Sequence, residues 1–288
     1  MHEKHRSLFE IHAAVALFGT AGLFGKWLLL SPFIIVLGRV FFASCALGLF
    51  FLFSAQALRV KSRKTFGLLG LLGFLLAVHW VAFFHSIQVS TVAVGLLSYS
   101  SFPVFTAFLE PVMFREKLEA SFLGFAFLCV LGVFLIIPRF DMTDTTTLGV
   151  LWGLLAGLTF AVLTIINRRL SQVHSSWLIA FYQDFWATVF LLPFAFVLRP
   201  SLTSRDVALL VVLGVFCTAG SHSLFIKGMR HIRARAASVI SSLEPVYGIL
   251  FALVLLGEVP SLRTVMGGAL ILAAAFAVTL RGSRPATS

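Results

Sequence analysis

One stretch of this chain occurs twice, first as Ser100-Ser-Phe-Pro-Val-Phe-Thr-Ala-Phe-Leu-Glu-Pro-Val-Met-Phe-Arg-Glu116. It returns as Ser242-Leu-Glu-Pro-Val-Tyr-Gly-Ile-Leu-Phe-Ala-Leu-Val-Leu-Leu-Gly-Glu258. A shift of 142 residues places Pro103 on Pro245 and the first final glutamate on the second. Each proline lies within an apolar run, where it removes a helix hydrogen bond and clashes with the preceding turn. The pattern predicts two interrupted helices at matching positions of an ancient duplication, which in membrane transporters mark the binding site.

The composition excludes a soluble protein. Of the 288 residues, 59% are hydrophobic and only 11% are charged, whereas a soluble domain has about a quarter charged residues. The net charge of +11 would suggest nucleic-acid binding in a soluble chain. Here the basic residues fall between apolar runs, so membrane topology accounts for them and no nucleic-acid partner is expected. The sequence predicts an all-α protein that crosses the lipid bilayer many times.

Apolar runs of about 20 residues predict ten transmembrane helices. They cover approximately 8–30, 33–53, 66–88, 91–113, 118–138, 148–168, 176–198, 207–227, 234–256 and 260–281. The connections between them are short, and none has room for a soluble domain. No cleavable signal peptide is evident at the start of the chain.

The basic residues alternate strongly between the two faces of this layout. The side holding the termini carries sixteen: Lys4, Arg6, Arg59, Lys61, Arg63, Lys64, Arg115, Lys117, Arg168, Arg169, Lys227, Arg230, Arg233, Arg235, Arg281 and Arg284. The other side carries five: Lys26, Arg139, Arg199, Arg205 and Arg263. Because cytoplasmic connections are enriched in Lys and Arg, both termini are expected in the cytoplasm, with the protein in the inner (plasma) membrane.

The duplication extends beyond the opening stretch. Residues Ser31–Ala43 align at a shift of 144 with residues Ser175–Ala187. The repeat unit is therefore five helices, and an odd number inserts the second copy upside down. We expect two inverted repeats, residues 1–141 and 142–288, around a central cavity.

These motifs resemble those of the drug/metabolite transporter superfamily, in particular the ten-helix exporters with two EamA-type repeats. The resemblance is carried by Pro103-Val104-Phe105 and Pro245-Val246-Tyr247, each followed by a glutamate at the end of its helix. The first copy departs from the usual Leu-Gly-Glu ending. The general look is nearest the exporters of amino acids and similar metabolites, which is analogy. The resemblance implies export, and it implies that the fifth and tenth helices brace the bundle.

Ionisable and polar side chains at membrane depth are costly and indicate function. The candidate substrate-binding residues are His79, Tyr99, His222, Glu244, Arg39 and Gln183. The candidate kink or gating residues are Pro103, Pro245 and Glu110.

Each candidate also has a structural interpretation. Glu244 could meet a substrate ammonium or take up a proton, or it could pair with a neighbouring helix. His79 and His222 could read substrate or proton, or could be packing residues. Arg39 would bind a substrate carboxylate if unpaired, whereas an ion pair with Asp184 would make both structural, and we favour the pair.

The spacing of Tyr99, Pro103, Thr106 and Glu110 places all four on one face of a continuous helix, which we expect to line the cavity. Glycines 149, 153 and 157 form a stripe that we expect to pack within the monomer. Glu116 and Glu258 are expected to cap the helix that follows each of them. The three cysteines, odd in number and within apolar runs, are expected to be packing thiols.

Signatures of catalysis, of metal binding and of nucleotide-driven transport are missing from the sequence. We expect no enzyme activity, no cofactor and no metal. The sequence therefore predicts a secondary transporter or facilitator that exports amino acids or similar small metabolites by alternating access, as a monomer or weak dimer, with proton coupling left open. The alternatives are a broad-range exporter of drugs, nucleosides or sugars, and an integral-membrane enzyme acting on a lipid-linked substrate.

Overall fold

The computed structural model describes residues 2–54, 58, 60, 62–114, 121–137, 139, 141–170, 173–221, 224–225, 240 and 243–281. Within these residues every regular element is a helix. Six helices are long and apolar enough to cross a membrane: His5–Trp27, Pro32–Phe53, Arg63–Val89, Val92–Met113, Thr145–Asn167 and Ser176–Leu198. Shorter apolar helices cover Leu123–Ile136, Glu244–Leu256 and Leu262–Ala277.

The helices follow the predicted order closely. Their bounds are α1 His2–Trp27, α2 Pro32–Phe53, α3 Arg63–Val89, α4 Val92–Tyr99, α5 Phe102–Phe114, α6 Ser121–Ile136, α7 Thr145–Leu170, α8 Ser176–Leu198, α9 Ser204–Gly214, the π-helix η1 Val215–Gly220, α12 Glu244–Leu256 and α13 Leu262–Arg281. The first part of the expected 234–256 helix lies outside the described residues, apart from Ile240.

Both prolines of the duplicated stretch stand at the start of a helix. The fourth span breaks at Ser100 and Ser101, and Pro103 is the second residue of α5. Pro245 is likewise the second residue of α12, directly after Glu244. Proline is tolerated there because the first helical N–H groups have no intrahelical partner. The expected interruption of the fourth span is therefore present, and α12 begins at the matching proline, while most of the chain before it lies outside the described residues.

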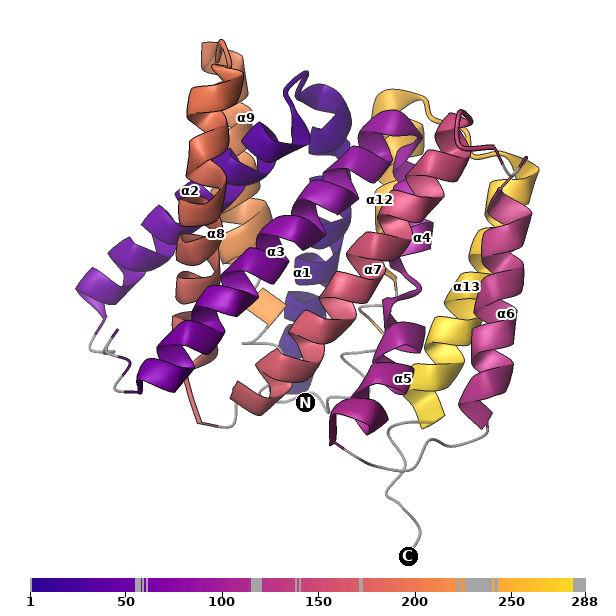
Figure 1. The fold of residues 1–288 in the computed structure, drawn as a ribbon, viewed down its shortest axis with the longest axis horizontal. Helices are drawn as coiled ribbons and strands as arrows, with labels where there is room; N and C mark the ends of the chain where they lie inside the picture. Colours follow the sequence, from indigo (N-terminus) through magenta and orange to yellow (C-terminus); the bar gives the residue numbers. More distant parts are fainter. Residues whose placement is uncertain are drawn as a thin grey trace, which may run out of the picture.

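The helices form one bundle, and the first and the last described helix have their chain ends at the same end of it (Figure 1). The beginning of α1 and the end of α13 are at the lower end in that view, which we call the proximal end. The α1–α2, α8–α9 and α12–α13 connections are at the opposite end, which we call the distal end. At one edge, α6 and α13 run side by side.

Small residues decide how closely α7 approaches the interrupted span. A Cβ atom added to Gly153 would lie 2.5 Å from the Ser98 Cβ, and one added to Gly157 would lie 2.9 Å from the Ser101 Oγ. Gly149 is similarly close to Ser90. The stripe therefore packs against α4 and its ends inside the monomer, as small-residue stripes do between membrane helices.

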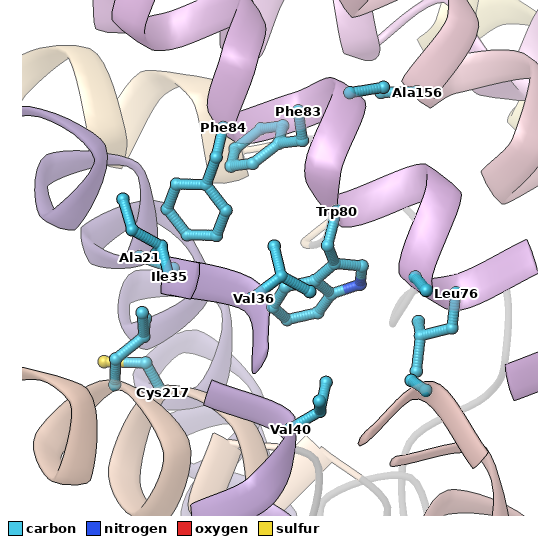
Figure 2. Packing of buried hydrophobic residues seen from close by; sticks show 14 of the residues in the cluster. Ala21, Ile35, Val36, Val40, Leu76, Trp80, Phe83, Phe84, Ala156 and Cys217 are labelled. Atoms are coloured by element: carbon cyan, nitrogen blue, oxygen red, sulfur yellow. The ribbon is translucent and has the colours of Figure 1, made fainter. Parts of the chain in front are cut away.

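The largest apolar cluster joins α1, α2, α3, α8 and η1. Figure 2 shows its centre, where Trp80 extends from α3 toward Val36 and Val40 of α2, with Phe83 and Phe84 on the same helix. Cys217 of η1 lies on the other side of this group. The cluster thus fills the space in which α2, α3 and η1 meet, beside the buried polar residues described below.

The contact between α6 and α13 gives a test with a control on the same helix. A Cβ atom added to Gly132 would lie 2.6 Å from the Gly267 carbonyl oxygen, whereas one added to Gly124 meets nothing within 4 Å. We expect Gly132→Ala to lower the free energy of unfolding by about 1–3 kcal/mol through overpacking. Gly124→Ala should be neutral, or stabilising by about 0.5–1 kcal/mol. Unfolding in detergent micelles measures both, and equal values would contradict this helix contact.

Candidate functional site

A buried arginine lies at the centre of the candidate site. Arg39 of α2 is only 4% exposed, and its Cζ atom is 2.6 Å from the centroid of the Trp80 ring. Its Nε donates a hydrogen bond to the Thr218 Oγ1 at 2.8 Å, and Nη2 makes a longer one to the Cys217 carbonyl oxygen at 3.5 Å. The indole face and η1 therefore hold the guanidinium, and no carboxylate of the described residues contacts it.

The π-helix η1 makes this arrangement possible. The Thr218 hydroxyl donates to the Leu213 carbonyl oxygen, five residues earlier, at 2.8 Å, and accepts from Arg39. A Cβ atom on Gly214 would lie 2.7 Å from the Arg39 carbonyl oxygen, so α2 and the start of η1 are in backbone contact. Such single-turn π-helices occur often at functional sites, because they redirect side chains that an α-helix would turn away.

Two carboxylates, those of Asp184 and Glu244, lie near Arg39 without contacting it. Its guanidinium lies within electrostatic range of Asp184, Glu244 and Tyr99. Among the described residues, however, neither carboxylate comes within the 4.0 Å of an ion pair with Arg39. The direct Arg39–Asp184 ion pair that the sequence favoured is therefore absent from this part of the chain. The reason is that Thr218 and Trp80 already occupy the positions next to the guanidinium.

His79 and Tyr99 belong to an aromatic group beside this centre. The His79 Nδ1 donates to the Ala156 carbonyl oxygen at 2.8 Å, so the proton is on Nδ1. Its ring centroid is 5.0 Å from that of Phe160 and 5.5 Å from that of Tyr99. Tyr99 in turn stacks on Phe102 at 5.4 Å. The group presents an apolar, aromatic wall within electrostatic range of Arg39.

Two other predicted residues are placed differently. Gln183 is buried and its Nε2 donates to the Asn167 Oδ1 at 2.5 Å, so its side chain joins α8 to α7. Its neighbour Asp184 is the residue of α8 that lies within range of Arg39. His222 lies outside the described residues.

Glu244 begins α12 at the point where this helix crosses α1. The side chain is half-buried, and a Cβ atom on Gly19 would lie 2.9 Å from the Glu244 carbonyl oxygen and 2.8 Å from the Gly248 nitrogen. The two backbones therefore touch at Gly19 and Gly248, close to the carboxylate.

The continuous polar face expected on the fourth span is wrong. Tyr99 ends α4, whereas Pro103, Thr106 and Glu110 belong to α5, beyond the break at Ser100 and Ser101. The break interrupts the helical repeat, so the spacing no longer places Tyr99 above the others. Pro103 is buried, and Thr106 donates to the Phe102 carbonyl oxygen of its own helix at 2.9 Å. Glu110 is half-buried further along α5.

A cluster of polar contacts holds three elements together at the distal end. The Glu258 Oε2 accepts from the Val92 backbone nitrogen at 2.8 Å, at the start of α4. Lys26 of α1 donates to the Ser90 carbonyl oxygen at 2.6 Å and is 3.9 Å from the Glu258 Oε1. Glu258 thus caps α4 and not α13, so the expected cap on the following helix is wrong for this residue. Glu116 lies outside the described residues.

Sequence reasoning missed the two partners that define the centre. Trp80 is not among the candidate residues of the sequence, yet the Arg39 guanidinium lies over its ring. Thr218 was not singled out, although Cys217-Thr218-Ala219-Gly220-Ser221 is a run of small and polar residues within an apolar span. That run was the available signal. All three cysteines are free, with Cys129 and Cys217 buried and Cys45 exposed.

The comparisons with known proteins agree on one kind of protein. The model of the EamA-like transporter family matches residues 7–137 and again residues 147–280. The uncharacterized transporter YxxF of Bacillus subtilis is 28% identical over 94% of this chain and 88% of its own length. An uncharacterized transporter of Archaeoglobus fulgidus is 31% identical over 79% of this chain and 82% of its own length.

A further relative has a named function, and a solved structure shares the fold. The pseudopaline exporter CntI of Pseudomonas aeruginosa is 27% identical over 83% of this chain and 84% of its own length. A protein of known crystal structure has the same fold, with a TM-score of 0.66 at 17% identity, over 98% of this chain and 99% of its own. With the family model matching most of the sequence, the chain belongs to the EamA-like transporter family, a family of ten-helix membrane transporters and not of enzymes.

Proposed function

We propose that this transporter exports amino acids or similar small metabolites by alternating access, from a site near the middle of the bundle. The observation that carries the proposal is the buried Arg39, held on the face of Trp80 with two carboxylates nearby but none in contact. The substrate class remains a proposal, and so do the inner-membrane location and the cytoplasmic position of both termini.

In this proposal, Arg39 binds the anionic end of the substrate. A guanidinium has five N–H donors, and the described residues accept from Nε and, at 3.5 Å, from Nη2. The remaining donors suit the two oxygens of a carboxylate, which a planar guanidinium binds in a bidentate manner. In a low-dielectric interior, such a charge-assisted pair offsets part of the cost of burying the arginine.

The carboxylates of Glu244 and Asp184 would bind the cationic end of the substrate. Glu244 is half-buried at the start of α12, and Asp184 is 3% exposed on α8. Both are within electrostatic range of Arg39 without touching it, so a small zwitterion could place its carboxylate on Arg39 and its ammonium beside an acid. The aromatic wall of His79 and Tyr99 would then contact the substrate's apolar part.

The other predicted residues take lesser roles in this proposal. His222 is proposed as a substrate contact, Gln183 as a residue that fixes α8 against α7, and Pro103, Pro245 and Glu110 as kink or gating residues. The halves 1–141 and 142–288 would rock against each other, as a monomer or weak dimer. Glu244 or a histidine would carry any coupled proton.

The second candidate function is a broader exporter of drugs, nucleosides or sugars. It is favoured by the many aromatic side chains, with 32 phenylalanines in the chain, and by the likeness to a pseudopaline exporter. Within an aromatic wall, stacking accepts many ring systems. The enzyme alternative is set aside, because the family is one of transporters.

Counterflow in proteoliposomes tests the role of Arg39. Liposomes loaded with a mixture of unlabelled amino acids take up radiolabelled ones singly. We expect Arg39→Gln to reduce uptake at least tenfold, or about 1.4 kcal/mol of lost transition-state or binding energy, since the carboxylate partner is lost. Arg39→Lys should recover only part, because it lacks the planar fork. Glu244→Gln should weaken uptake of substrates that carry an ammonium.

The matched control is Arg139→Gln, which removes a charge from an exposed connection. All variants are compared after gel filtration and thermal melting confirm folding. If folded Arg39→Gln transports as well as Arg139→Gln, the site is placed wrongly although the transport proposal stands. If the unaltered protein takes up no amino acid, the broader exporter becomes the better hypothesis.

The distal contacts of Lys26 and Glu258 would close one entrance of the alternating-access cycle. Glu258→Gln keeps an acceptor for the Val92 nitrogen but loses the ion pair. Since the two side chains are 25% and 22% exposed, the pair is worth roughly 0.5–1 kcal/mol. We therefore expect the population of the state that is open at the distal end to increase about two- to fivefold.

Cys217 is the probe for this opening, because it is 3% exposed next to Arg39. In a background with Cys45 and Cys129 replaced by alanine, a membrane-impermeant thiol reagent is added from the distal side. The labelling rate should rise in Glu258→Gln and stay unchanged in Arg263→Gln, an exposed charge at the same end. An unchanged rate in both variants would show that these contacts do not hold the entrance closed.

A further inference from the structure

A cavity of about 600 Å³ lies at the distal end, away from Arg39. It is bounded by the connection between α1 and α2 and by the connection between α8 and α9. Its lining residues are Trp27, Leu29, Leu30, Ser31, Ile34, Leu198, Arg199, Pro200, Ser201, Thr203, Arg205 and Asp206. Nothing in the proposed transport mechanism uses this cavity.

The charge of the cavity is unusual for its face of the molecule. The sequence places only five basic residues on the distal side, and two of them, Arg199 and Arg205, line this one cavity. Within the described part of the chain, neither side chain makes a hydrogen bond or an ion pair. Two exposed, positively charged residues whose side chains have no such partner among the described residues therefore line the same space.

The single carboxylate in the cavity is already engaged. The Asp206 Oδ2 accepts from the Thr203 nitrogen at 3.0 Å and from the Thr203 hydroxyl at 2.7 Å, which caps α9. The hydrogen bond from the Thr203 side chain lowers the pKa of Asp206 from its ordinary value. The carboxylate thus stays ionised as a helix cap, and it leaves the cavity with a net positive charge.

The backbone places Arg199 where glycine is more usual. Its φ is 43°, in the left-handed region, and its amide donates to the Ala195 carbonyl oxygen at 3.1 Å to end α8. For a non-glycine residue this conformation costs about 1 kcal/mol. The conformation brings the arginine into the cavity lining directly at the end of α8.

The rim of the cavity is apolar and exposed. Leu29 and Leu198, which line the cavity, are 94% and 45% exposed, and Val197 next to Leu198 is 76% exposed. Arginines beside exposed leucine and valine at a helix end are typical of the boundary between hydrocarbon and headgroups. An occupant of this cavity would therefore have an anionic head and an apolar body.

The cavity is also separated from the central site. Ile34 lines it, and Arg39 follows five residues later on α2, about 7.5 Å along the helix axis. Between them, a Cβ atom on Gly38 would lie 2.7 Å from a Leu210 methyl carbon. Tight packing of α2 against α9 thus closes the way from the cavity to Arg39.

We propose that this cavity binds a phosphate group, with an anionic phospholipid as its source. The phosphate oxygens accept from Arg199 and Arg205, while the acyl chains lie along the exposed apolar rim. A lipid bound there links the α1–α2 connection to the α8–α9 connection. The site is independent of the substrate that the transporter carries.

Native mass spectrometry of the full chain released from micelles tests the proposal. The protein is equilibrated with equal amounts of phosphatidylglycerol and phosphatidylcholine. We expect the unaltered protein and Arg263→Gln to retain phosphatidylglycerol about tenfold over phosphatidylcholine. In the double variant Arg199→Gln/Arg205→Gln this preference should fall to about one, and the double lysine variant should keep most of it, since lysine also binds phosphate.

Two results would count against the proposal. Equal retention of phosphatidylglycerol by the double glutamine variant and by Arg263→Gln would overturn it. A lack of lipid preference, combined with thermal stabilisation by inorganic phosphate that is lost in the double variant, would overturn the lipid source and leave a site for soluble phosphate. If Arg199→Gln disturbs folding at its left-handed position, Arg205→Gln alone gives the same comparison. Counterflow activity is measured in parallel, so a failure here is separate from a failure of the transport proposal.

Discussion

The contact between the Arg39 guanidinium and the Trp80 ring is the interaction on which the centre of this transporter depends. A positive charge at membrane depth must be compensated, and here an indole face, a threonine hydroxyl and a backbone carbonyl do so at short range. Asp184 and Glu244 act from further away. Because none of the carboxylates in the described ranges contacts Arg39, its charge is compensated there without a direct ion pair. An arginine held in a bidentate ion pair would have fewer donors left for another molecule.

That centre needs helices that do not run smoothly through the membrane. The π-helix η1 turns Thr218 toward Arg39, and the break between α4 and α5 ends one helix at Tyr99. The start of α12 brings Glu244 to the crossing with α1. Glycines 149, 153 and 157 then let α7 pack against the broken span. Irregular backbone is tolerated in a bilayer only where the protein itself surrounds it, which is the case here.

The sequence predicted the order of the described helices and the break in the fourth span, because apolar runs indicate helices and proline interrupts their hydrogen bonds. It did not predict partners across the bundle. The favoured Arg39–Asp184 ion pair is absent from the described residues, although Asp184 lies within electrostatic range, and Gln183 beside it joins α8 to α7. Glu258 was assigned to the next helix in the chain, whereas it caps α4 from the other half. Trp80 and Thr218 have no periodic signal, since stacking and a π-turn depend on neighbours that only the fold brings together.

The close glycine contact between α1 and α12 allows these two helices to pivot over each other. Gly19 and Gly248 meet through backbone atoms, with the Leu96 side chain also close to Gly248, so few side chains have to move when one helix swings over the other. Seven residues separate Gly19 from Lys26, which is about 10 Å of helix. A rotation of α1 by about 20° around this contact would move Lys26 by about 3.5 Å. A water molecule could then enter between Lys26 and Glu258, while the contact between Gly19 and Gly248 stays free of water.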